Sequence, residues 1–192
     1  SPSPPSRRRL FRDACCTALG ALAATALPAR ADTPARKTTL TPDQALARLK
    51  KGNEDFLGDH SQVSPQGRER RLEIARSQAP FAILVGCSDS RVSPELLFDT
   101  GLGELFIVRN AGNTVDTVAL GSIQYGVLVL GVPLIVVLGH ERCGAVDAAL
   151  GVITDDKRYP GSINQMIEPI LPSALLATRK GLKGEELLDE AV

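Results

Sequence analysis

Three short runs of aliphatic residues dominate the hydrophobic pattern of the chain. They are "FAILVG" at 81–86, "ELFIVRN" at 104–110 and "PLIVVLG" at 133–139. Each run is continuous rather than alternating, which is typical of strands covered on both faces, as in a parallel sheet. The segment "DTVALGSIQYGVLVLG" at 116–131 is long enough for a helix between the second and third runs, which predicts a right-handed crossover. Its apolar residues available for burial are Val118, Ile123, Val127 and Leu130.

Further helices are predicted around these runs. Within 40–59, Thr41 can cap a helix, and Gln44 completes a capping box three residues later. The segments 68–78 and 144–151 are also predicted as helices, the first of them largely charged and solvated. Together these elements predict an α/β fold of three layers, α/β/α, with a central, mainly parallel sheet and an N-terminal helical arm.

Composition indicates one globular domain behind a basic leader. The 192 residues are 43% hydrophobic, and 22 Lys and Arg balance 22 Asp and Glu, so the overall charge favours neither nucleic acid nor an anionic membrane. Residues 1–31 have a basic opening, a small apolar run and an A-x-A cleavage pattern, which predict an export signal. "SRRRLFR" at 6–12 resembles the twin-arginine signal of proteins that are exported folded.

This leader sets the expected domain limits and location. We expect a signal at 1–31, a linker at 32–40 and a domain at 41–192, with the mature protein periplasmic or secreted and not inserted in the membrane. Two alternatives stay open, namely a leader retained as an anchor and export of the unfolded chain.

Two cysteines remain once the leader is set aside. Cys15 and Cys16 lie in the leader, whereas Cys87 and Cys143 each follow an aliphatic run, and His140 precedes Cys143 by three residues. The carboxyl ends of parallel strands meet at one edge of a sheet, so two strand ends can bring these three donors together. Thiolates and an imidazole suit zinc, and three such ligands leave a fourth position open. In an oxidising compartment, the alternative is a disulfide.

The residues around these donors resemble a known family. Asp89 and Arg91 follow Cys87 at intervals of two in "CSDSR" at 87–91, and "GHERCGA" spans 139–145. In this order, each after a predicted buried strand, the two motifs resemble those of the β-class carbonic anhydrases. The segment "GELFIVRNAGN" between them is also similar to the family. Members continue past the final predicted helix, "GEELLDEAV", into more helix and an edge strand, so we expect the domain to be truncated at its C-terminus.

The resemblance implies an activity and a metal site. Members of the family hydrate carbon dioxide reversibly to bicarbonate and a proton, using one Zn²⁺ per subunit. The matching positions place this zinc on Cys87, His140 and Cys143. Asp89 and Arg91 would form a paired switch beside the metal, with Asp89 as a further zinc ligand in a closed state.

The resemblance also implies substrate-binding residues and an oligomer. Gln78 resembles the substrate-orienting glutamine of the family. Phe106 and Tyr125 resemble apolar pocket residues that are contributed across a dimer interface, so a homodimer or higher homo-oligomer is implied. From the residues alone, Gln78 can simply end a helix, and Phe106 and Tyr125 can be ordinary core residues.

Two other functions stay open at this point. A zinc hydrolase of a related cumulene, carbonyl sulfide or carbon disulfide, would keep the same site and differ in the shape of its channel. A non-catalytic zinc or disulfide module is the other alternative, although Asp89 and Arg91 have no evident task in it.

Overall fold

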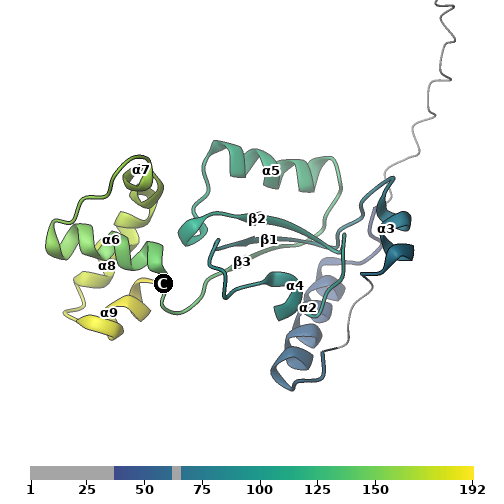
Figure 1. The fold of residues 1–192 in the computed structure, drawn as a ribbon, viewed down its shortest axis with the longest axis horizontal. Helices are drawn as coiled ribbons and strands as arrows, with labels where there is room; N and C mark the ends of the chain where they lie inside the picture. The colour runs from purple at the N-terminus through teal and green to yellow at the C-terminus, as the bar shows by residue number, and fades with distance from the viewer. Residues whose placement is uncertain (1–36, 62–65) are drawn as a thin grey trace, which may run out of the picture. The chain divides into compact units, whose positions relative to one another are not determined.

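A parallel sheet lies at the centre of the computed structural model, which describes residues 37–61 and 66–192. Its strands are β1 (Ala82–Gly86), β2 (Leu105–Arg109) and β3 (Ile135–Leu138). They are arranged in the order β2-β1-β3, and both neighbouring pairs are parallel (Figure 1). The predicted sheet is therefore confirmed, whereas the predicted signal and most of the predicted linker lie outside the described residues.

Helices make up most of the remaining described structure. The capping box is present, because the Gln44 N–H donates to Thr41 Oγ1 and the Gln44 side chain accepts from the Thr41 N–H. Two 3₁₀ turns, η1 (Ala111–Asn113) and η2 (Glu168–Ile170), accompany the α-helices. The α-helices are α2 (Pro42–Leu57), α3 (Arg68–Ile74), α4 (Pro94–Leu97), α5 (Thr117–Leu128), α6 (Gly144–Asp155), α7 (Ile163–Ile167), α8 (Leu171–Thr178) and α9 (Gly184–Ala191).

The two faces of the sheet are covered by different helices, which confirms the three-layer arrangement. On one face, Leu49 of α2 packs in a buried cluster with Ala82 of β1. On the other face, Ile83 of β1 packs in a second cluster with Ile123 of α5. Figure 1 shows α5 on one side of the sheet and α2 with α4 on the other.

The burial of the strands and of α5 differs from the prediction. All five residues of β1 are buried, but β2 is only half-buried and β3 alternates between exposed and half-buried residues. The reason is the strand order, since β2 and β3 are the outer strands. Val118, expected to be buried, is 77% exposed, and Val127 is also exposed.

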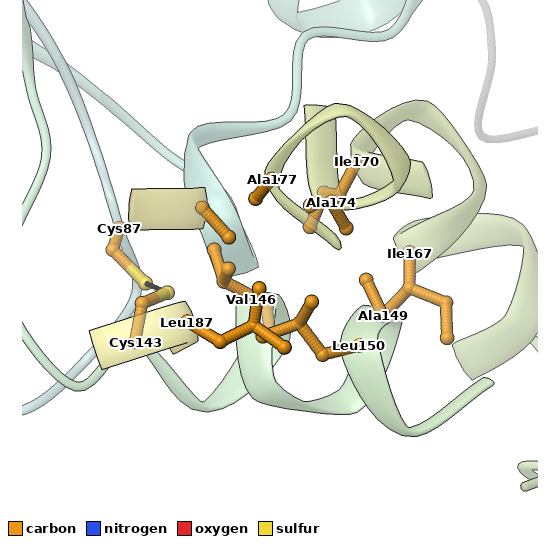
Figure 2. Close-up of a cluster of buried hydrophobic side chains, with 12 residues drawn as sticks. Cys87, Cys143, Val146, Ala149, Leu150, Ile167, Ile170, Ala174, Ala177 and Leu187 are labelled. Carbon is orange, nitrogen blue, oxygen red and sulfur yellow. Dashed lines mark hydrogen bonds between the residues drawn. The ribbon is translucent and has the colours of Figure 1, made fainter. Parts of the chain in front are cut away.

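A separate apolar cluster is formed by the helices after β3. Leu150 of α6, Ile167 of α7, Ala174 of α8 and Leu187 of α9 pack together, and Figure 2 shows these side chains converging on a common interior. Cys87 and Cys143 lie at one side of the same cluster. Within 37–61 and 66–192, no helix has the length and apolar character needed to cross a membrane.

Candidate metal centre

Cys87 immediately follows β1 and is held from two directions. The Gly112 N–H of η1 donates to Cys87 Sγ at 3.3 Å. The Arg109 guanidinium donates from Nε to the Cys87 carbonyl at 2.7 Å and from its terminal nitrogen to the Asp89 carbonyl at 2.6 Å. These bonds tie the loop after β1 to the end of β2, so the thiol has one defined position.

His140 and Cys143 flank the turn between β3 and α6. Cys143 is the N-cap residue of α6, and the backbone N–H groups of Ala145 and Val146 face its sulfur. The ring atom His140 Nδ1 lies 2.9 Å from the Glu141 carbonyl oxygen. A carbonyl oxygen can only accept, so Nδ1 carries the proton and Nε2 keeps a free lone pair. Nε2 is buried and has no hydrogen-bond partner among the described residues.

The three donor side chains converge on one point. Their ligand atoms, on Cys87, His140 and Cys143, all lie within 4.8 Å of one another. The two sulfurs are 3.9 Å apart, as marked in Figure 2, and both cysteines are free. A disulfide requires about 2.05 Å. Two thiolates bound to one tetrahedral zinc at about 2.3 Å would lie about 3.8 Å apart. The arrangement therefore fits a shared metal and not a disulfide.

The electrostatics of the two thiols also fit a cation. Burial raises the pKa of Cys87, but surrounding hydrogen-bond donors, chiefly the Gly112 N–H, more than offset this, and the pKa is lowered. Burial raises the pKa of Cys143, and a neighbouring Cys87 thiolate raises it further. The protein itself thus stabilises the thiolate of Cys87, whereas a second thiolate at Cys143 requires a positive charge nearby.

Asp89 and Arg91 form an ion pair beside this centre. The Arg91 guanidinium donates to Asp89 Oδ1 at 2.9 Å and to Oδ2 at 2.8 Å, and the Arg91 N–H also donates to Oδ1 at 2.9 Å. Arg91 donates further to the Arg142 carbonyl at 3.1 Å. These side-chain and backbone bonds from Arg91 hold the pKa of Asp89 well below its usual range. Asp89 Oδ2 lies 4.0 Å from His140 Nε2, so the carboxylate borders the metal position while bound to Arg91.

The other predicted site residues lie away from these donors. Gln78 is exposed in the loop before β1, whereas Cys87 follows the opposite end of that strand. Phe106 of β2 and Tyr125 of α5 form a tilted ring pair with centroids 6.3 Å apart on the α5 side of the sheet. A single chain therefore brings together Cys87, His140, Cys143, Asp89 and Arg91, but not Gln78, Phe106 or Tyr125.

Several supporting residues were not identified from the sequence. Gly112 contacts a ligand sulfur, and the backbone carbonyl of Arg142 accepts a hydrogen bond from Arg91. Arg109 shapes the loop that carries Cys87 and Asp89. The segment "RNAGN" at 109–113 was noted only because it is similar to the family. Its residue types do not by themselves indicate that it contacts the residues that bind a metal.

Known proteins are similar to this chain in sequence and in fold. The profile of the carbonic anhydrase family matches residues 82–191, which include all three donors. Carbonic anhydrase 2 of Mycobacterium tuberculosis is 48% identical over 141 residues, covering 73% of this chain and 68% of the relative. The carbonic anhydrase of Mycolicibacterium smegmatis is 46% identical over 141 residues, which again cover 73% of this chain and 68% of the relative. A β-carbonic anhydrase of Coccomyxa superposes with a TM-score of 0.57 at 30% identity, covering 81% of this chain and 67% of that one.

The chain belongs to the β-class carbonic anhydrase family. β-Carbonic anhydrases use zinc, and the donor set of this member matches that metal in ligand type, sulfur spacing and the free Nε2 of His140. In this β-carbonic anhydrase, Asp89 is paired with Arg91. Among the described residues, the donor set therefore consists of three protein ligands and has no fourth.

Proposed function

We propose that the protein hydrates carbon dioxide reversibly to bicarbonate and a proton, with one zinc ion per subunit bound by Cys87, His140 and Cys143. The observation that carries the proposal is the buried Nε2 of His140, which has no partner within 37–61 and 66–192, beside two free thiols whose sulfurs are 3.9 Å apart. Zinc supplies Lewis acidity, which lowers the pKa of a bound water from 15.7 to about 7 in favourable sites.

The protein's own contribution centres on Asp89. Because Arg91 keeps the pKa of this carboxyl low, the group is ionised at neutral pH and can only accept hydrogen bonds. Its Oδ2 lies 4.0 Å from His140 Nε2, where it can orient a proton-bearing reactant next to the donor set. Arg91 holds the carboxylate in this orientation through two side-chain bonds. The Arg91 contact to the Arg142 carbonyl connects this pair to the loop that carries Cys143.

Stopped-flow kinetics on the zinc-loaded protein tests the reaction. We expect carbon dioxide hydration whose rate rises in proportion to zinc occupancy, with much slower hydrolysis of carbonyl sulfide and carbon disulfide. Faster turnover of either sulfur compound would favour the cumulene hydrolase. A zinc-loaded protein that turns over none of the three would favour a non-catalytic module.

We also propose that the protein works as a homodimer or a higher homo-oligomer that joins through α5 and the outer edge of β2. Val118 and Leu128 of α5 are 77% and 76% exposed, and Tyr125 is 46% exposed. A hollow of about 270 Å³ runs along five consecutive residues of this edge, Phe106 to Asn110. A solved structure from Sordaria macrospora, described with the words "two tetrameric beta-carbonic anhydrases", matches this chain at 25% identity and a TM-score of 0.58. A second copy could also supply Gln78, which its own chain keeps at the far end of β1.

The double variant Val118→Glu, Leu128→Glu is expected to dissociate the oligomer. Two carboxylates on a buried apolar contact would be desolvated without partners, whereas in a single chain both positions already face water. Sedimentation velocity should show a shift to monomer. Leu176→Glu on α8, at a position that is 60% exposed, is the matched control and should keep the parental mass. A double variant that sediments as the parent does would place the interface elsewhere.

Export is a further proposal, which rests on the sequence of the leader. We propose delivery of the folded, metal-loaded protein to the periplasm, because free thiols that arrive unfolded would risk oxidation to a disulfide. Changing Arg7 and Arg8 together to Lys should hold the precursor in the cytoplasm, as judged by immunoblots of cell fractions. Arg12→Lys in the same segment is the control. The unfolded-export route requires only positive charge, so normal export of the double variant would support that route instead.

A further inference from the structure

One short turn forms hydrogen bonds to both halves of the metal centre. The Gly112 N–H of η1 donates to Cys87 Sγ at 3.3 Å. The neighbouring Asn113 donates from Nδ2 to the Leu138 carbonyl at 2.8 Å. Leu138 is the last residue of β3, two residues before His140. The turn therefore links the strand end that carries Cys87 to the strand end that carries His140.

We propose that Asn113 is a positioning residue for zinc binding, which holds His140 at the metal by clamping the end of β3. Gly112 makes the matching bond on the Cys87 side, so the two residues together set the separation of the two ligands. The inference rests on the zinc site of the proposed function and concerns only this chain's own residues.

The backbone of the turn is suited to a rigid link. Gly112 and Asn113 both have positive φ angles, 68° and 57°. Glycine adopts this region freely, and asparagine is among the few other residues enriched there. A Cβ on Gly112 would lie 2.5 Å from Ile170 Cδ1 and 3.0 Å from Ala145 Cβ. The turn is thus pressed against the helical cluster and cannot shift toward it.

The orientation of the Asn113 amide explains the residue type. The Leu138 carbonyl can only accept, so the NH₂ group must face it. The other end, Oδ1, is buried without a partner among the described residues, which is an unfavourable arrangement. Asn113 lines a small cavity together with His140 and Cys143. Such an unfavourable arrangement is explained if the hydrogen bond from the amide NH₂ group has a function. An aspartate has the same shape but could not donate this hydrogen bond to the Leu138 carbonyl.

Zinc affinity of two variants and one control tests the proposal. Asn113→Asp keeps the shape of the side chain but removes the donor, and Asn113→Gly removes the side chain while tolerating the positive φ. We expect each to weaken zinc binding about 10–100-fold, as is typical when a group that supports a metal ligand is lost. Asn110→Asp is the matched control, because the Asn110 Nδ2 bond ends within the loop, on the Thr114 carbonyl at 2.8 Å. The control should bind zinc with nearly parental affinity.

Affinities would come from chelator competition, and the geometry from the visible spectrum of the cobalt-substituted protein. A displaced imidazole should alter the cobalt ligand-field bands of both Asn113 variants and leave those of Asn110→Asp unchanged. Parental affinity and spectrum in Asn113→Gly, or an equal loss in the Asn110 control, would overturn the proposal. If Asn113→Asp fails to fold, Asn113→Gly decides alone. Neither readout uses turnover, so failure of carbon dioxide hydration would be distinguished from failure of the positioning role.

Discussion

Replacing Cys143 by serine is expected to strip zinc from the protein and to reduce carbon dioxide hydration to the background rate. A serine hydroxyl stays protonated at neutral pH and is a poor replacement for a thiolate, which is the softer ligand. Loss of a group that only supports a ligand costs about 10–100-fold in metal affinity, so loss of the ligand itself should cost more than about 100-fold. Elemental analysis after dialysis against a chelator measures the change.

The fold should survive this substitution. Cys143 is the N-cap residue of α6, a position at which serine is favoured, and the two side chains have similar volumes. Circular dichroism and the unfolding midpoint of the zinc-free proteins provide the control, and these values should be similar for the parent and the variant. Full zinc occupancy in Cys143→Ser would show that the ligand assignment is wrong.

Replacing Arg91 by alanine is expected to lower kcat/KM about 10–100-fold and to bring Asp89 onto the metal. Arg91 supplies both side-chain bonds to the Asp89 carboxylate, and Oδ2 already lies 4.0 Å from His140 Nε2. Without the guanidinium, a zinc ion held by Cys87, His140 and Cys143 would offer the carboxylate a positive partner beside it. X-ray absorption at the zinc edge should show an added oxygen ligand at low pH. Because hydroxide competes for the same position, the inactive limb of the pH profile should extend to higher pH than in the parent.

Two further variants separate this effect from a general loss of charge. Asp89→Asn should also lower turnover, but its neutral amide should not cap the zinc, so the pH dependence that arises from capping should flatten. Arg142→Ala removes an arginine that pairs with Glu185 and keeps the backbone carbonyl that accepts from Arg91, so it should behave as the parent does. An Arg91→Ala protein with the parental pH profile and no carboxylate on zinc would rule out the switch.

The sequence by itself determined the elements and the donors of the metal centre. The three aliphatic runs predicted β1, β2 and β3 within two residues at each end, and the capping box of α2 formed as Thr41 and Gln44 indicated. These features depend on local periodicity and on hydrogen bonds between near neighbours, which a sequence displays directly. The donors could be found in the same way, because Cys87 directly follows β1, His140 and Cys143 lie within five residues of the end of β3, and parallel strands end at one edge.

Only the tertiary structure decided which residues are exposed and how the donors are held. Val118 faces outward, and β2 and β3 are outer strands, because strand order follows from contacts between segments far apart in the chain. The bond from Asn113 to Leu138 spans 25 residues, and the Arg91 contact to Arg142 spans 51. Such bonds depend on where whole elements pack, and no spacing along the sequence reports them.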